Sequence, residues 1–141
     1  ENMKKFHHHI FLLRSPKACM ESAYRVTKSN SAEGNYFDAS EAGFKELVEN
    51  YKWIKEHVEA DPLVLDGDDF VDPEKMTRIF KHVCGRIGME FEPSMLTWEK
   101  KKIDDAFGAF HDGINNSTGI KKIEHEAIEF PKEVTDAIAV N

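Results

Sequence analysis

The sequence lacks several features that would place it in common classes of protein. Its apolar runs fall far short of the ~20 residues that a membrane-spanning helix needs. No apolar segment with a small-residue cleavage site follows the opening lysines, as a signal peptide requires. Basic residues are in deficit, with 19 Lys and Arg against 26 Asp and Glu and a formal net charge of −7. This balance argues against a nucleic-acid partner or an anionic membrane surface.

Cysteine is scarce, and the two that occur, Cys19 and Cys84, lie far apart in segments with helical patterns. We expect two free thiols in a reducing compartment rather than a disulfide. The overlapping glycosylation sequons in NNST, residues 115–118, matter only in a secreted chain. These features favour an intracellular, cytoplasmic protein.

What the sequence does contain is an ordinary globular composition, with 141 residues, 40% of them hydrophobic and 32% charged. The continuous apolar run Ile10–Leu13 is typical of a strand buried on both faces, as in a parallel sheet. Ser15 and Pro16 then predict a helix start, and the order of elements predicts an α/β fold with a right-handed crossover. We expect at least two strands and four helices. The strands are predicted at 8–13 and 63–66, and the helices at 16–28, 41–58 capped by Ser40, 73–87 capped by Asp72, 103–114, and from Pro131 onward.

Three consecutive histidines, His7 to His9, suggest a metal site, but strand geometry sends His8 to the opposite face from the other two. A zinc site needs three or four ligands, so we expect no metal here. The acidic stretch beginning at Asp66 fails as a calcium loop, because Phe70 and Val71 occupy positions that need an oxygen ligand and glycine. We interpret that stretch as a turn between a strand and a helix.

Arg14 follows the first predicted strand, and in open parallel sheets ligands bind at the carboxyl ends of the strands. The helix start after it presents free backbone N–H groups, and a guanidinium fork suits a phosphate or sulfate. Ser22, two turns into that helix, can add a hydroxyl donor if its face turns toward the site. The alternative is a structural ion pair between Arg14 and one of three carboxylates, Asp66, Asp68 or Asp69.

The segment HIFLLRSPKACMESAYR resembles the second cofactor segment of the sulfotransferases: strand, arginine, short turn, helix, and a serine eight residues after the arginine. The stretch PLVLDGDDFVDPEKMTRIFKHVCGRIGMEFEPSMLTWE closely resembles a branch of sulfotransferase-like P-loop proteins, and FHDGINNSTGI resembles the end of that branch. The resemblance runs in order from about His9 to Ile120. It implies a P-loop-like three-layer α/β fold, present in part, that binds 3′-phosphoadenosine 5′-phosphosulfate (PAPS).

The resemblance further implies transfer of a sulfuryl group from PAPS to a hydroxyl or amine of a small-molecule or glycan acceptor. Arg14 and Ser22 would hold the 3′-phosphate of PAPS or of adenosine 3′,5′-bisphosphate. The family's glycine-rich phosphate loop has no counterpart in the 141 residues, and no catalytic residue can be assigned. The chain by itself is therefore not expected to be a complete sulfotransferase.

Three interpretations follow for residues 1–141, which we treat as one segment, the C-terminal part of a sulfotransferase-like domain. The segment is part of a longer polypeptide, or half of an enzyme completed by a second chain, or a degenerate relative kept as a non-catalytic interaction subunit of a larger assembly. Two strands alone leave apolar edges that need covering. We therefore expect that the segment is not a stable monomer and that a missing N-terminal segment or a second protein chain covers it.

Overall fold

The structure is a computed structural model, and it describes residues 2–29, 36–100, 112–122 and 126–140 of the chain. Within these ranges the chain is a mixed α/β protein with one parallel sheet, which confirms the expected fold class. The elements in chain order are η1 (Asn2–Lys5), β1 (Ile10–Leu13), α1 (Pro16–Ser29), η3 (Ala39–Ala42), α2 (Phe44–His57), β2 (Leu63–Asp66), η4 (Gly67–Val71), α3 (Pro73–Ile87), η5 (Pro93–Leu96), α4 (Asp112–Asn115) and α5 (Lys132–Val140), where η marks a 3₁₀ helix.

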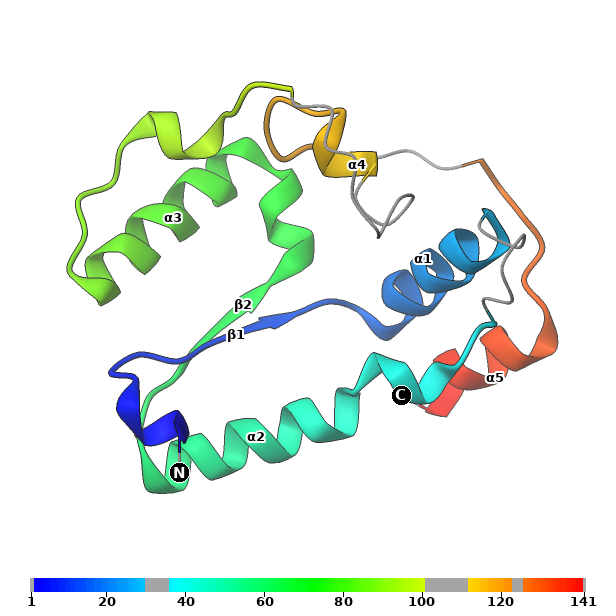
Figure 1. Ribbon diagram of the computed structural model, residues 1–141, viewed down its shortest axis with the longest axis horizontal. Coiled ribbons are helices and arrows are strands. Elements are labelled where there is room, and N and C mark those ends of the chain that lie inside the picture. The colour runs from blue at the N-terminus through cyan, green and yellow to red at the C-terminus, as the bar shows by residue number, and fades with distance from the viewer. Residues whose placement is uncertain (1, 30–35, 101–111, 123–125, 141) are drawn as a thin grey trace.

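Strands β1 and β2 pair in parallel, with Ile10 opposite Leu63 and Leu13 opposite Asp66. The chain between them passes through α1 and α2, since parallel neighbours need a long crossover rather than a hairpin. Figure 1 shows α2 along one side of the strands and α3 along the other. The sheet is therefore the middle layer of three.

The most completely buried core lies away from the sheet, where α1 meets α5 (Figure 1). The side chains of Met20 on α1 and Val134 on α5 are 1% and 0% exposed. The ring of Tyr24 lies edge-on to those of Phe37 and Phe130, with centroids 6.1 and 5.8 Å apart. Segments from both ends of the chain therefore share one core.

The start and end of α3 follow the signals in the sequence. The carboxylate of Asp72 accepts the backbone N–H groups of Glu74 and Lys75 at 2.9 and 3.1 Å, and proline occupies the first helical position. Gly88 ends the helix in the left-handed conformation, at φ 74°. The hydrogen bond from the backbone of Lys75, followed by that from Glu74, lowers the pKa of Asp72. The predicted cap is therefore confirmed.

The start of α2 differs from the prediction, because Ser40 does not cap it. Asp38 instead caps the preceding short helix η3, accepting the N–H and the hydroxyl of Ser40 at 2.8 and 2.7 Å. Gly43 then adopts a left-handed conformation, at φ 63°, and α2 begins at Phe44. A residue at positive φ interrupts the helical backbone, so the expected helix over 41–58 was wrong at its start.

The remaining helices agree with the sequence where the structure describes them. Helix α1 runs from Pro16, and α5 follows Pro131, as predicted. The helix expected over 103–114 falls largely on residues 101–111, which lie outside the described residues. Its last positions coincide with α4.

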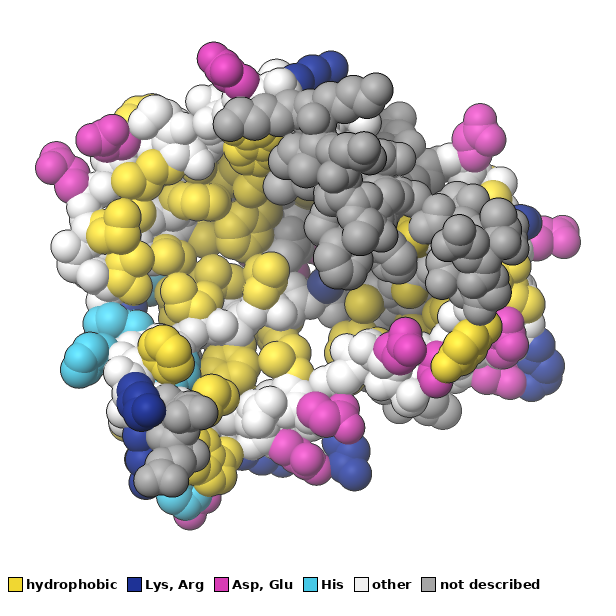
Figure 2. All heavy atoms as spheres, in the orientation of Figure 1, with side chains coloured by type: hydrophobic (Ala, Val, Ile, Leu, Met, Phe, Trp, Pro, Cys, Tyr) yellow, Lys and Arg dark blue, Asp and Glu magenta, His cyan; other side chains and the backbone are white. Residues whose placement is uncertain are grey.

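Much of the apolar surface of the sheet stays exposed in the part of the chain that the structure describes. On the face away from α2, Ile10 and Leu12 are 43% and 59% exposed, and Val64 on the other face is 43% exposed. Figure 2 shows hydrophobic side chains gathered over the strands and the helices beside them. The central layer is therefore incompletely covered.

Candidate functional site

The carboxyl ends of β1 and β2 lie side by side, and Arg14 is the first residue beyond β1. Gly67 follows β2 at the same edge. A Cβ atom on Gly67 would lie 2.9 Å from the carbonyl oxygen of Leu13 and 3.8 Å from the Cβ of Arg14. This approach of two backbones requires glycine, and it brings Arg14 next to the turn after β2.

The start of α1 lies at the same edge of the sheet. The hydroxyl of Ser15 accepts the backbone N–H of Ala18 at 3.1 Å, which confirms the predicted cap. Helix N-termini carry a partial positive charge and unpaired N–H donors. Arg14 and the start of α1 together form a candidate anion site.

Ser22 lies deeper in α1 and is half-buried. It follows Ser15 by seven residues, so both lie on the same side of the helix, about 10 Å apart along its axis. Met20, on the opposite side, faces the core shared with α5. No hydrogen bond joins Ser22 to Arg14 among the described residues. The structure therefore brings Arg14 and the helix start together and leaves Ser22 two turns away.

The carboxylates proposed as alternative partners of Arg14 have other roles. Asp66 accepts the backbone N–H of Asp68 at 2.9 Å, and Asp69 forms an ion pair with Lys75. The hydrogen bond that the Lys75 ammonium donates to Asp69 raises the pKa of Lys75. Within the described ranges, no ion pair joins Arg14 to these three carboxylates. The guanidinium is exposed, although the nearby acids make this edge mixed in charge.

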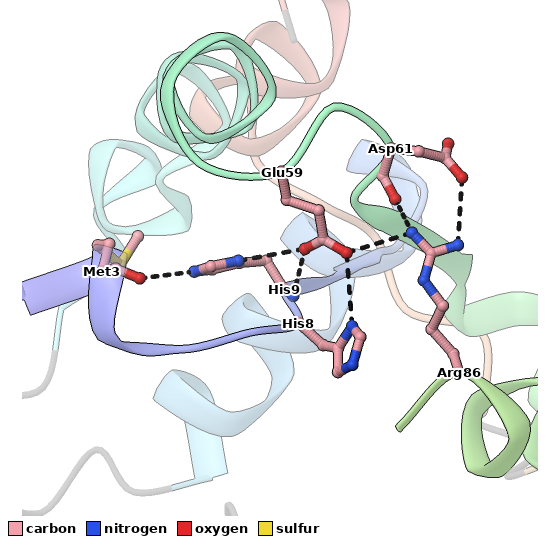
Figure 3. Close-up of polar contacts among 6 residues, drawn as sticks. All are labelled: Met3, His8, His9, Glu59, Asp61 and Arg86. Carbon is pink, nitrogen blue, oxygen red and sulfur yellow. Dashed lines mark hydrogen bonds and ion pairs between the residues drawn. The ribbon is translucent and has the colours of Figure 1, made fainter. Parts of the chain in front are cut away.

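A second polar cluster lies at the opposite, amino end of the strands (Figure 3). Glu59, in the loop between α2 and β2, accepts the backbone N–H of His9 at 2.8 Å, and its Oε2 lies 3.2 Å from His9 Nδ1. Arg86 at the end of α3 donates to Glu59 Oε1 at 3.2 Å and to Asp61 Oδ2 at 3.1 Å. The side chains of Glu59 and His9 are only 13% and 9% exposed. We call these four residues and His8 the clasp cluster.

The clasp cluster holds the carboxylate of Glu59 in the ionised form. Burial raises the pKa of Glu59, but hydrogen bonds from the His9 backbone, Arg86 and the His9 ring outweigh burial and lower it. Hydrogen bonds to Asp61 and then to Glu59 raise the pKa of Arg86. The cluster is therefore a set of ordered charges joining β1, the loop before β2, and α3.

Sequence reasoning missed the clasp cluster, because Glu59 lies 50 positions from His9 and 27 from Arg86. The run of histidines before the first strand was a signal, but strand alternation pointed His8 and His9 to opposite faces. The structure instead brings His8 Nδ1 within 3.6 Å of Glu59 Oε1, so both imidazoles reach the same carboxylate. The predicted strand over 8–13 was therefore wrong at its start: β1 begins at Ile10, and strand alternation does not apply to the two histidines before it.

An apolar pocket of about 290 Å³ lies between α2 and the sheet. Its lining residues are all hydrophobic or aromatic: Phe11, Leu13, Leu47, Val48, Tyr51 and Val64. Arg14 does not line the pocket, so the candidate anion site and this pocket are separate features.

Among the described residues, no three His, Cys, Asp or Glu side chains come together as a metal site. In the same part of the chain, no helix is long and apolar enough to cross a bilayer. The thiols of Cys19 and Cys84 are both free, as expected.

Comparison with known proteins finds no match for this chain among protein-family models, curated proteins or solved structures. The resemblance to sulfotransferases therefore stays a prediction from the residues themselves.

Proposed function

We propose that this chain is the 3′-phosphate-binding, C-terminal portion of a sulfotransferase that moves a sulfuryl group from PAPS to an acceptor hydroxyl or amine. The observation that carries the proposal is the position of Arg14 at the carboxyl end of a parallel strand, beside the capped start of α1. Ligands of open parallel sheets bind at this edge. No described carboxylate neutralises Arg14.

The roles of the residues follow from their chemistry. The guanidinium of Arg14 can donate two parallel hydrogen bonds to the 3′-phosphate of the cofactor. The free N–H groups of the first turn of α1 add donors of the same kind. Ser22 would add its hydroxyl if α1 shifts or the ligand extends along the helix. The phosphosulfate end of the cofactor needs a phosphate loop that these 141 residues do not contain.

The proposal is tested by calorimetric titration of the full chain with adenosine 3′,5′-bisphosphate and, in parallel, with adenosine 5′-monophosphate. We expect the bisphosphate to bind more tightly, because only it carries the 3′-phosphate. Arg14→Ala should abolish that preference, at a cost of about 1.5–3 kcal/mol for a charge-assisted hydrogen bond. Ser22→Ala should weaken it less.

Lys52→Ala is the matched control, since it removes one exposed positive charge from α2, away from the strand ends. It should leave both affinities unchanged. Equal affinity of the wild-type chain for the two nucleotides, or an equal loss of bisphosphate affinity in Arg14→Ala and Lys52→Ala, would refute the role assigned to Arg14.

The second candidate is a non-catalytic interaction subunit with a sulfotransferase-derived fold. The exposed apolar side chains of the sheet favour it, because monomeric proteins rarely expose large contiguous apolar patches. Under this proposal the chain binds neither nucleotide and associates with another protein chain. Under both proposals the chain alone is not a stable monomer, so a single monomeric species in sedimentation velocity would contradict both.

A further inference from the structure

The ring of His9 lies between two hydrogen-bond acceptors (Figure 3). Its Nδ1 lies 3.2 Å from Glu59 Oε2, and its Nε2 lies 3.1 Å from the backbone carbonyl oxygen of Met3. Met3 belongs to η1, the first helix of the chain. The His9 ring therefore connects η1 to the loop that precedes β2.

Neither acceptor can supply a proton. A backbone carbonyl has no hydrogen to donate, and the lowered pKa of Glu59 keeps its carboxylate ionised near neutral pH. A neutral imidazole carries one N–H, so either tautomer would turn a nitrogen lone pair toward an oxygen. The doubly protonated imidazolium alone donates to both acceptors.

The formal charges of the groups around the ring do not balance without a proton on a histidine. Glu59 and Asp61 contribute two negative charges, and Arg86 offsets one of them. One further positive charge balances the cluster. His8 is the competing site, with its Nδ1 3.6 Å from Glu59 Oε1, but its side chain is 40% exposed against 9% for His9.

The other groups around the ring do not alter this balance. Phe6 packs edge-on to the His9 ring, with 6.5 Å between centroids, and carries no charge. Lys4 and Lys5 on η1 are exposed. Among these groups, His9 is therefore the one whose hydrogen bonds change when it gains or loses a proton.

We propose that His9 is a proton-dependent clasp: the imidazolium fastens η1 to the amino end of the sheet, and loss of the proton releases η1. Neutral His9 can keep Glu59 through Nδ1–H or Met3 through Nε2–H, but not both. The attachment of η1 is complete while His9 is protonated and Glu59 ionised. It is lost as pH rises and His9 deprotonates, and again as pH falls through the lowered pKa of Glu59.

The test is nuclear magnetic resonance of the ¹⁵N-labelled full chain, titrated from about pH 5 to about pH 8, where histidine side chains change charge. The ring nitrogens of His9 report its protonation, and the backbone amides of residues 3–5 report whether η1 is ordered. We expect both signals to change together with one midpoint. A neutral His9 at the acidic end, or an η1 that ignores the His9 titration, would overturn the proposal.

Variants separate the clasp from a purely structural contact. His9→Gln is neutral throughout, so η1 should be released at every pH and its pH dependence lost; the signals of the fully buried Ile54 report whether this variant folds. His7→Gln, at an exposed neighbouring position, should retain the wild-type coupling. His8→Gln should also retain it. Loss of coupling in His8→Gln, or its survival in His9→Gln, would assign the switch to another group and refute the proposal.

Discussion

The corner between α1 and α5 and the two-stranded sheet contain similar residue types but are packed very differently. At the corner, Met20 and Val134 are 1% and 0% exposed. In the sheet, Leu12 is 59% exposed and Val64 43%, although continuous apolar strands are typical of sheets covered on both faces. The corner is a fully buried core, whereas the sheet is covered only in part by the described residues.

This difference makes the sheet, rather than the corner, the region where a binding surface is expected. Buried apolar area stabilises a fold by roughly 25 cal/mol per Å². The corner obtains this stabilisation within the chain, and the described residues leave part of the apolar area of the sheet uncovered. A region left in that condition suits association with further protein, which fits either proposed function.

The largest expected effect is at the corner. Met20→Ala removes a fully buried side chain and should lower the free energy of unfolding by about 2–5 kcal/mol, because a cavity remains. Leu12→Ala, at an exposed position, should change it by no more than about 0.5 kcal/mol. Urea denaturation followed by circular dichroism measures both. Similar losses for the two variants would mean that Leu12 is buried in solution, and the comparison would fail.

The next effect concerns the turn after β2, where Gly67 lies against the backbone of β1. Gly67→Ala places a Cβ 2.9 Å from the carbonyl oxygen of Leu13, and we expect a loss of about 1–3 kcal/mol from overpacking. Gly85→Ala is the matched control, since nothing outside the backbone of its own helix and its chain neighbours lies within 4 Å of an added Cβ, and α3 continues through it. That change should stabilise the chain by about 0.5–1 kcal/mol. Equal midpoints of thermal unfolding would contradict the close approach at Gly67.

A smaller effect on stability, with a clear effect on the surface, is expected from a charge in the sheet. Leu12→Lys should reduce binding of an apolar fluorescent dye such as 1-anilinonaphthalene-8-sulfonate and lower self-association, because it interrupts the exposed apolar face. Met89→Lys changes a residue that is also exposed, at 53%, but lies beyond α3. It should leave dye binding nearly unchanged. An equal drop in both variants would show that the sheet is not the main apolar surface.

The smallest effect concerns the cap of α3, the helix beside the sheet. The lowered pKa of Asp72 means that the cap stabilises the fold above the ordinary range of aspartate, near pH 4, and is lost as pH falls through the folded pKa. Asp72→Asn should keep much of the cap and lose this pH dependence. Asp72→Ala should lose both. Thermal unfolding at several pH values distinguishes them. Identical curves for the wild type and both variants would show that the cap does not contribute to stability.

Sequence reasoning performed best where neighbours along the chain decide the outcome. Asp72, Pro73 and Gly88 identified α3 because caps and breakers act within a few residues. It failed at Ser40, where Asp38 and the positive φ of Gly43 moved the start of α2. The roles of Arg14 and Ser22 stay predictions, since the structure supports the position of Arg14 but leaves Ser22 two turns along the helix.

The sequence by itself determined most of the local elements, the α/β order and the candidate cation at the end of the first strand. Tertiary structure alone decided which distant segments meet: α1 with α5 at the corner, Gly67 with the backbone of Leu13, and His9 with Glu59 and Arg86. The physical reason is range. Helix and strand signals repeat over a few residues, whereas a half-buried carboxylate 50 positions from its histidine leaves no periodic signal in the sequence.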